Sequence, residues 1–378
     1  MSGDKKLLVT FLFIFISMLS LKAQETAAVI PQPFTFEASY IGEVAGNFTG
    51  GIKTGATYLG LANLAAGFDT QKAGWWKGGE LRINAANTHG GEPSANLVGD
   101  FQGVSNIEAG NLTFLYELWY KQTIDNLSLT VRLQDLNANF AKSENGSIFT
   151  NSSFGIHSSI ADNIPSPIYP LTALGATLQW NVPGRLSMQA AIFDGTPDDF
   201  ENNPYNTGWK LSKNDGFLTV MEFQFPKSMI NGFDGIYKIG SYYHQHNDTI
   251  DMEQQNYGFY FDGDQDIYKT ANGMMSVFSQ IGISPKNENK NNLYYSLGFR
   301  INGISAKRKF DVTGIAIAYA GFGRTPSRNE TAIELTYRIY ANETISIKPD
   351  LQYIINPSGT DAKVKNALTG LLRVELNF

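Results

Sequence analysis

The feature that most constrains this chain is an alternation of apolar and polar residues with a period of two. The clearest case closes the chain, where Gly370, Leu372, Val374, Leu376 and Phe378 alternate with Leu371, Arg373, Glu375 and Asn377. Successive side chains of a β-strand point to opposite faces, so this spacing places one set on each face of a strand. Similar segments recur along most of the sequence and predict an all-β protein.

The alternating segments and weaker ones between them predict sixteen strands. They lie near residues 34–45, 51–63, 79–89, 111–122, 126–137, 169–181, 185–194, 216–225, 234–245, 254–262, 273–283, 291–302, 309–321, 329–341, 343–355 and 366–378. Short and long connections alternate where the strands are clearest, and the longest span 90–110, 138–168 and 195–215. The register is weakest between Asp262 and Asn272. An even strand number with this alternation of loops is typical of a membrane-spanning barrel.

The N-terminus carries an export pattern. Lys5 and Lys6 precede an apolar run from Leu7 to Leu19, followed by a short segment that ends at Ala23. This charge–apolar–cleavage order is typical of a secretory signal peptide, and the run is too short to span a bilayer as a helix. A membrane anchor is the alternative. We expect residues 1–23 to be a cleaved signal peptide and 24–378 to form one outer-membrane β-barrel domain.

Composition narrows the class further. The chain has no cysteine, which excludes disulfides and thiolate metal sites. Its net charge is −6, and removing Lys5, Lys6, Lys22 and Asp4 takes away +2 and leaves −8, so nucleic acid is a poor partner. Charged residues make up 17%, below the ~25% usual in soluble proteins. We predict a transmembrane, antiparallel, up-and-down β-barrel; the alternative is a soluble sandwich whose apolar faces point inward.

Several blocks of the chain resemble the carbohydrate-selective porins of the OprB family. They are WWKGGELRINAANTHGGEPS, LVGDFQGVSNIEA, LYELWYKQ, FTNSSFG, SPIYPLTALGATLQW, FDGTPDDF, FSQIGISP and ELTYRIYANETISIKPDLQYIINPSG. The segment 309–323 departs from the family pattern. The ending on Phe378 resembles the C-terminal strand that the barrel assembly machinery recognises. The resemblance implies a barrel surrounded by outer-membrane lipid in a Gram-negative bacterium. It also implies passive diffusion of small saccharides without a cofactor.

A sugar pore needs weak, distributed contacts for hydroxyl groups and for apolar ring faces. Carboxylates accept hydroxyl protons, Arg and Lys donate, and aromatic faces cover the rings. The polar positions of the strands supply candidate pore-lining residues: Glu80, Arg82, Glu117, Trp119, Arg132, Asp135, Arg300, Glu334, Arg338, Lys348, Asp350 and Gln352. Glu117, Trp119 and Arg132 rank highest because they lie on neighbouring strands beside two long loops. The alternative is that these charges form ion pairs that only brace the wall.

One long loop and a pair of tryptophans are further candidates for a role in the pore. The 138–168 loop either folds into the lumen, burying Phe149, Phe154, Ile156 and Ile160, or caps the barrel from outside. Trp75 and Trp76 suit an interfacial aromatic girdle better than sugar stacking.

Two clusters resemble metal sites only weakly. His244 and His246 share a strand face but have no evident third ligand, which favours a position at the barrel rim. Asp262, Asp264 and Asp266 imitate the start of a calcium loop without its Gly and Glu, so at most they bind a cation weakly at an exposed turn.

Rival functions remain open at this level. A general or ion-preferring porin would share the fold and differ in its lumen. An outer-membrane hydrolase would need a nucleophile beside a His, but the chain has four His (89, 157, 244 and 246) and neither a Gly-x-Ser-x-Gly nor a His-Glu-x-x-His motif. We therefore predict a channel rather than an enzyme.

Overall fold

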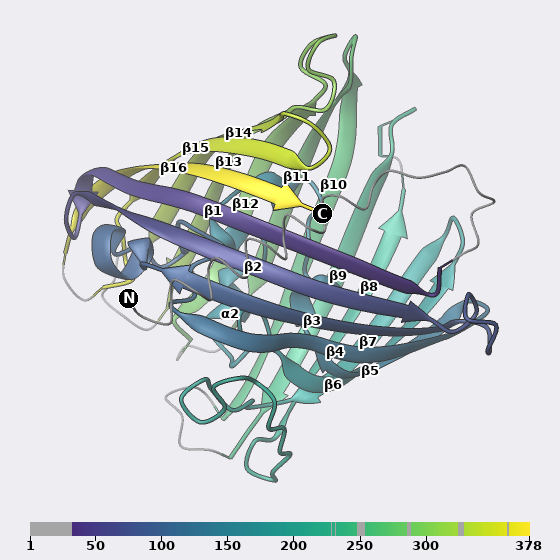
Figure 1. Cartoon of the computed structure of the whole chain (residues 1–378). Coiled ribbons are helices and arrows are strands. Elements are labelled where there is room, and N and C mark those ends of the chain that lie inside the picture. Colours follow the sequence, from purple (N-terminus) through teal and green to yellow (C-terminus); the bar gives the residue numbers. More distant parts are fainter. Residues whose placement is uncertain are drawn as a thin grey trace, which may run out of the picture.

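The computed structural model is a closed antiparallel barrel (Figure 1). It describes residues 32–378 except 228, 231, 248–253, 286–288, 324–328 and 361–362. The predicted signal peptide, residues 1–23, lies outside the described residues. The strands are β1 (Phe34–Gly51), β2 (Gly55–Asp69), β3 (Gly79–Gly90), β4 (Leu112–Ile124), β5 (Leu127–Gln134), β6 (Ala173–Val182), β7 (Leu186–Asp194), β8 (Phe217–Pro226), β9 (Gly235–Gln245), β10 (Gln255–Lys269), β11 (Met274–Ile283), β12 (Asn291–Asn302), β13 (Val312–Phe322), β14 (Glu330–Tyr340), β15 (Ile345–Ile355) and β16 (Lys365–Asn377).

Each strand pairs with its sequence neighbours, and β16 closes the barrel against β1. The seam is supported from inside the barrel, where Arg373 Nε donates to Glu43 Oε2 at 2.6 Å. The predicted up-and-down barrel of sixteen strands is confirmed. No helix among the described residues is long and apolar enough to cross a membrane.

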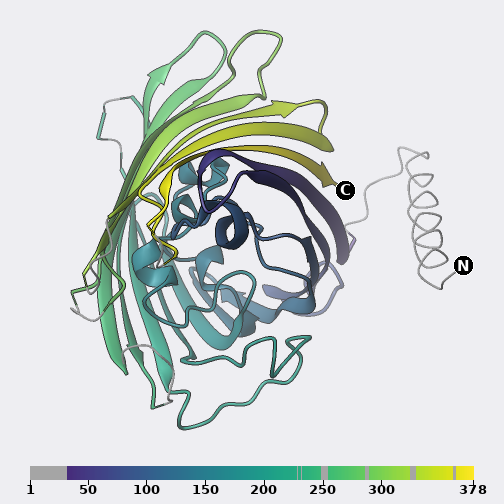
Figure 2. The ribbon, with the colours of Figure 1, turned by 90° about the vertical axis from the view of Figure 1, so that its left-hand side faces the viewer.

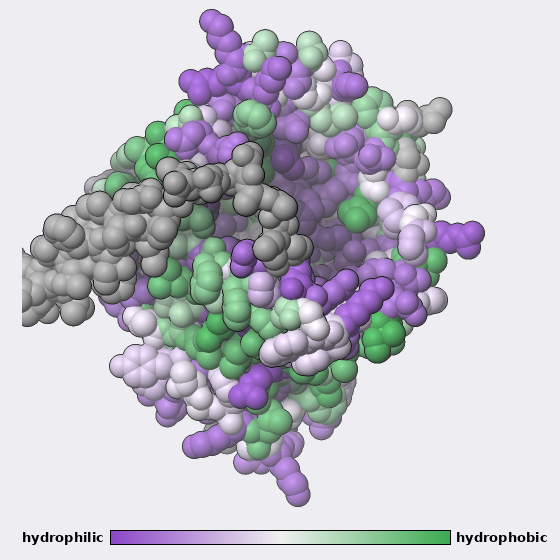
Figure 3. All heavy atoms as spheres, turned by 45° about the vertical axis from the view of Figure 1, so that its right-hand side comes forward, coloured by the Kyte–Doolittle hydropathy of each residue, from purple (hydrophilic) through white to green (hydrophobic). Residues whose placement is uncertain are grey.

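The apolar face of the wall points outward. Phe36 is 78% exposed and Leu64 is 58% exposed, whereas Glu43 and Gln352, on the inner face, are 0% exposed. Figure 3 shows the same division, with hydrophobic side chains on the outer wall and hydrophilic ones in the hollow that opens at the near end. A soluble sandwich would show the reverse, so the outward apolar surface excludes that alternative.

Two strands differ from their predicted form. β10 continues to Lys269, so Asp262, Asp264 and Asp266 lie within a strand and not at an exposed turn. The predicted cation-binding turn is therefore wrong; polar residues and Gly263 interrupt the apolar alternation that would have marked this strand. In β4, a bulge opposite Asn84 and Ala85 shifts the register.

The β4 bulge changes which side chains of the strand point into the barrel. Beyond it, Phe114 is only 2% exposed and packs inside the barrel, although strict alternation places it on the lipid side. One extra residue reverses the facing of every residue beyond it, which is why the sequence pattern fails here. Tyr116, at the bulge, also points inward and hydrogen-bonds the carboxylate of Asp135.

Two long connections fold into the barrel (Figure 2). The β3–β4 loop contains a π-helical turn, η2 (Ser94–Val98), and the β5–β6 loop contains η3 (Leu136–Ala138), η4 (Gly146–Ile148), η5 (Ser152–Phe154) and α2 (Ser158–Ala161). Phe149, Phe154, Ile156 and Ile160 of the second loop are buried against the wall. Of the two positions left open for the 138–168 loop, the structure therefore shows the one inside the lumen, and burial of these apolar side chains explains it.

Candidate permeation pathway

Carboxylates on the wall hold both inserted loops in place. Glu330 accepts hydrogen bonds from the backbone N–H groups of Phe101 and Gln102 in the β3–β4 loop at 2.8 and 2.9 Å. Glu334 accepts from the backbone N–H groups of Thr150 and Asn151 in the β5–β6 loop. Each of these side chains thus binds two consecutive backbone N–H groups of a loop and fixes that loop against the wall.

This docking removes four predicted residues from the open path. Glu334, Lys348, Asp350 and Gln352 are 6% exposed or less and lie between the wall and the β5–β6 loop. Lys348 Nζ donates to the Ile148 carbonyl and Thr150 Oγ1 donates to Asp350. The prediction that they line open water is corrected, because strand alternation marks an inward face but not what covers it.

Two predicted arginines also contact protein groups. Arg338 pairs with Glu375 at 3.1 Å, and Arg300 Nη1 donates to Asn145 Oδ1 of the β5–β6 loop at 3.1 Å. These contacts fit the alternative that inward charges brace the wall.

At the end of the barrel where β1 begins and β16 ends, polar side chains on the inner wall remain exposed. Arg82 pairs with Glu37 at 2.8 Å, and Lys121 pairs with Glu80 at 3.1 Å. Trp119 lies opposite Arg82 across the β3–β4 ladder, and its indole N–H donates to Glu117. A hollow of about 310 Å³ here is lined by Glu80, Arg82 and Trp119, among others. The structure thus gathers five charged groups and an aromatic face at this end.

Arg132 is turned toward a different partner. Its guanidinium lies 4.7 Å from the ring centroid of Trp209, in the β7–β8 loop, and its backbone φ of 104° is unusual for a residue with a side chain. This cation–π contact links the wall to that loop, which the sequence did not indicate.

A further hollow, which we call the central hollow, lies between the two inserted loops and the wall formed by β2 and β4. Its volume is about 500 Å³. The lining mixes aromatic faces, amides, hydroxyls and carboxylates, including Phe101, Gln102, Asn106, Glu108, Tyr116, Asp135, Asn137, Asp162 and Tyr169. Of these, only Asp135 was predicted from the sequence. The others lie on irregular loops or at the β4 bulge, where no periodic signal marks the facing of a side chain.

The comparisons with known proteins agree with this geometry. The sequence model of the carbohydrate-selective porin, OprB family, matches residues 53–378. The chain belongs to this family. As a member it is a carbohydrate-selective outer-membrane porin.

Individual relatives of this porin are distant in sequence. Porin B of Pseudomonas aeruginosa is 22% identical over 93% of this chain and 88% of its own. The putative porin QuiX of Acinetobacter baylyi is 21% identical over 92% of this chain and 90% of its own. The high-pH structure of Pseudomonas putida OprB, 21% identical, covers 92% of this chain and 94% of its own with a TM-score of 0.81. The last comparison supports the same barrel fold.

The loop carboxylates of the porin's central hollow share one electrostatic feature. Burial raises the pKa of Asp162 to about 7, against a weaker opposing effect from Lys290. Burial also raises the pKa of Glu108 to about 7, although the backbone N–H groups of Ser94 and Ala95 lower it in part. The pKa of Asp135 is raised to about 6 by burial, which outweighs its bond from Tyr116. All three therefore change charge near neutral pH.

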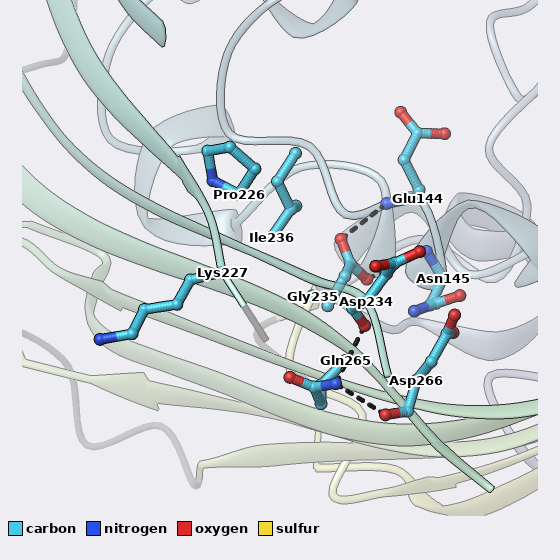
Figure 4. Close-up of a pocket in the computed structure, with 10 residues that line it drawn as sticks. Glu144, Asn145, Pro226, Lys227, Asp234, Gly235, Ile236, Gln265 and Asp266 are labelled. Carbon is cyan, nitrogen blue, oxygen red and sulfur yellow. Dashed lines mark hydrogen bonds between the residues drawn. The ribbon is translucent and has the colours of Figure 1, made fainter. Parts of the chain in front are cut away.

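A third hollow, about 440 Å³, lies where the tip of the β5–β6 loop meets β8–β10 (Figure 4). Asp264, on the wall, accepts hydrogen bonds from the Ser143 hydroxyl and from the backbone N–H groups of Glu144 and Asn145. Asp234 and Asp266 also line this hollow. Asp264 therefore secures the loop tip.

The histidines of the porin have structural contacts. His157 Nε2 lies 2.8 Å from Asp262 Oδ1, fully buried, and joins the β5–β6 loop to the wall. His244 is buried and hydrogen-bonds the Gly195 carbonyl, so it lies beneath the β7–β8 loop and not on an open rim. Within the described ranges, no group of three His, Cys, Asp or Glu side chains is placed to hold a metal. Trp75 and Trp76 are exposed beside Phe68, in keeping with a girdle position.

Proposed function

We propose that small sugars cross this porin by passive diffusion through the central hollow between the two inserted loops. The observation that carries the proposal is the lining of that hollow, which combines two tyrosine rings with amide and carboxylate acceptors. Its volume of about 500 Å³ lies within the ~300–1,000 Å³ typical of small-molecule sites.

The chemistry of the lining suits a polyhydroxylated solute. Tyr116 and Tyr169 have ring centroids 5.9 Å apart at 77°, which offers two apolar faces for a sugar ring. Carboxylate oxygens of Glu108 and Asp162 replace water as acceptors for hydroxyl protons. Because these contacts are spread over several groups, a sugar can leave as readily as it enters.

The row of Glu37, Arg82, Trp119, Glu80 and Lys121 supplies a second set of contacts in the wider part of the lumen. Trp119 is oriented by Glu117 and flanked by an arginine that is already paired. We assign this row a role in guiding solutes between the hollow and the periplasm, and the predicted roles of Glu80, Arg82, Glu117 and Trp119 are retained there.

Further parts of the proposal concern export and assembly. Residues 1–23 would be removed as a signal peptide, and the strand that ends on Phe378 would be recognised by the barrel assembly machinery. Leu372 and Val374 of that strand are exposed on the outer surface, as contact with outer-membrane lipid requires.

The test compares a tyrosine of the hollow with one on the outer wall. Tyr116→Leu removes a ring face from the path, whereas Tyr257→Leu alters a lipid-facing side chain. In proteoliposomes, we expect Tyr116→Leu to reduce the ratio of glucose flux to that of an uncharged non-sugar of similar size by about threefold. Tyr257→Leu should leave the ratio unchanged. Equal ratios in all three proteins would indicate a general diffusion porin instead.

A further inference from the structure

The charged side chains that line the central hollow are all acidic. Glu108, Asp135 and Asp162 line it, and no Lys, Arg or His among the described residues does so. Arg373 of β16 contacts the β3–β4 loop, and its guanidinium is engaged with Glu43, Ser105 and Asn106. The lining itself therefore carries negative charge and no cation; Lys290 acts on Asp162 from outside the lining.

Asp162 differs from the other two carboxylates. Asp135 accepts the Tyr116 hydroxyl and the Asn137 backbone N–H, and Glu108 accepts backbone N–H groups of η2. The Asp162 carboxylate has no hydrogen bond or ion pair to any described residue, although it lies partly buried just after α2. A partly buried carboxylate without a partner is costly, so it is the group with most to gain from a cationic solute.

A second observation also indicates a missing donor. Gln102 lines the hollow and is 3% exposed. Its side-chain N–H donates to Glu330 at 3.3 Å, but its carbonyl oxygen has no partner among the described residues. Such buried acceptors are normally satisfied, so this oxygen indicates a donor that the protein itself does not provide.

Several donors around the hollow are already engaged by the protein. The Asn137 amide donates to the Phe140 and Gly155 carbonyls, and the Ser158 hydroxyl donates to Asn291. The hydroxyl of Tyr169 donates to the Ile107 carbonyl. The three carboxylates and the ring faces of the two tyrosines line the hollow beside them.

We propose that this hollow favours amino sugars, hexoses that carry an ammonium group, over neutral sugars of the same size, with Asp162 as the partner of the ammonium. The inference rests on the proposed route through the hollow. An ammonium group supplies both an ion-pair partner, which Asp162 lacks among the described residues, and donors for nearby acceptors. Sugars that bear a carboxylate or phosphate would instead meet like charges and pass slowly.

The experiment measures uptake of labelled glucosamine, glucose and glucuronate into proteoliposomes that contain the full-length porin at pH 7. We expect glucosamine to enter at least about threefold faster than glucose, and glucuronate to enter more slowly than both. Asp162→Asn should bring the glucosamine-to-glucose ratio close to one. Asp162→Lys should place glucuronate ahead of glucosamine. Heat-modifiable gel migration confirms that each variant is a folded barrel.

The matched control is Glu144→Gln, which removes a carboxylate from the same loop but outside the central hollow and should retain the wild-type ratio. A wild-type ratio of one or less, or a ratio unchanged in Asp162→Asn, overturns the inference. So does equally fast entry of tetraethylammonium, which has no hydroxyl groups. Failure of the proposed function is a separate result: glucose would then enter no faster than an uncharged non-sugar of its size.

Discussion

Asp264 and Asp162 are both carboxylates inside the barrel, but their surroundings differ. Asp264 accepts three hydrogen bonds from the tip of the β5–β6 loop, whereas Asp162 has no partner among the described residues. The first kind of carboxylate ties a loop to the wall, and the second faces the solute path. A residue's part in this porin therefore depends on its partners more than on its type.

At the residue scale, we predict that Asp264→Asn loosens the loop tip. An amide supplies one acceptor oxygen in place of two and no charge, so about 1.5–3 kcal/mol of local stability should be lost. Hydrogen exchange of the Glu144 and Asn145 amides should accelerate by about tenfold or more. The control is Asp266→Asn, since Asp266 accepts from Ser276 on the wall and not from the loop. Equal exchange in both variants would contradict the docking role.

A second residue-scale prediction concerns pH. The pKa values of Glu108 and Asp162 are raised to about 7 and that of Asp135 to about 6, so these groups are neutral below these values and charged above them. The charges that act on them belong to Asp100, Glu117 and Lys290. Preference for K⁺ over Cl⁻ should therefore rise between about pH 5.5 and 8, as measured from reversal potentials in a KCl gradient.

The control for this pH effect is Asp162→Asn, which should show a smaller rise over the same range. A selectivity that stays flat with pH, or that rises equally in the variant, would mean that these carboxylates do not face the ion path.

At the scale of elements, the β5–β6 loop behaves as a fixed part of the lumen. Its apolar side chains fill clusters against β7–β13, and its α2 turn contacts β12, where the Ser158 hydroxyl lies 3.2 Å from Asn291 Oδ1. We predict that a disulfide between Ser158→Cys and Asn291→Cys leaves single-channel conductance unchanged on oxidation. The chain has no other cysteine, so no competing disulfide can form within it. A conductance that changes between the oxidised and reduced forms would show that the loop moves during transport.

The strands were predictable from sequence because each buries one face against lipid and wets the other, which leaves a period of two. That signal placed all sixteen strands. It failed in detail at the β4 bulge and along β10, where Gly263 interrupts the apolar face. The inserted loops have no period. Their apolar residues predicted burial, but neither their contacts nor the hollow that they leave could be read from spacing, so Glu108, Asp162 and Tyr169 were missed.

At the scale of the whole molecule, a single layer of strands separates two surfaces of opposite polarity. The outer surface is apolar, and the inner surface carries the charges and amides that hold the loops and line the path. A barrel of sixteen strands would otherwise leave a wide aqueous channel. The β3–β4 and β5–β6 loops fill much of that space.

The most direct test of this account is the ion current through a single reconstituted channel, recorded with and without glucose, maltose and an uncharged non-sugar of similar size to glucose. If sugars occupy the hollow between the loops, glucose should reduce the current in a saturable manner, and the non-sugar should change it only through bulk viscosity. Tyr116→Leu should weaken the glucose effect. Identical current changes for glucose and the non-sugar would contradict the central claim.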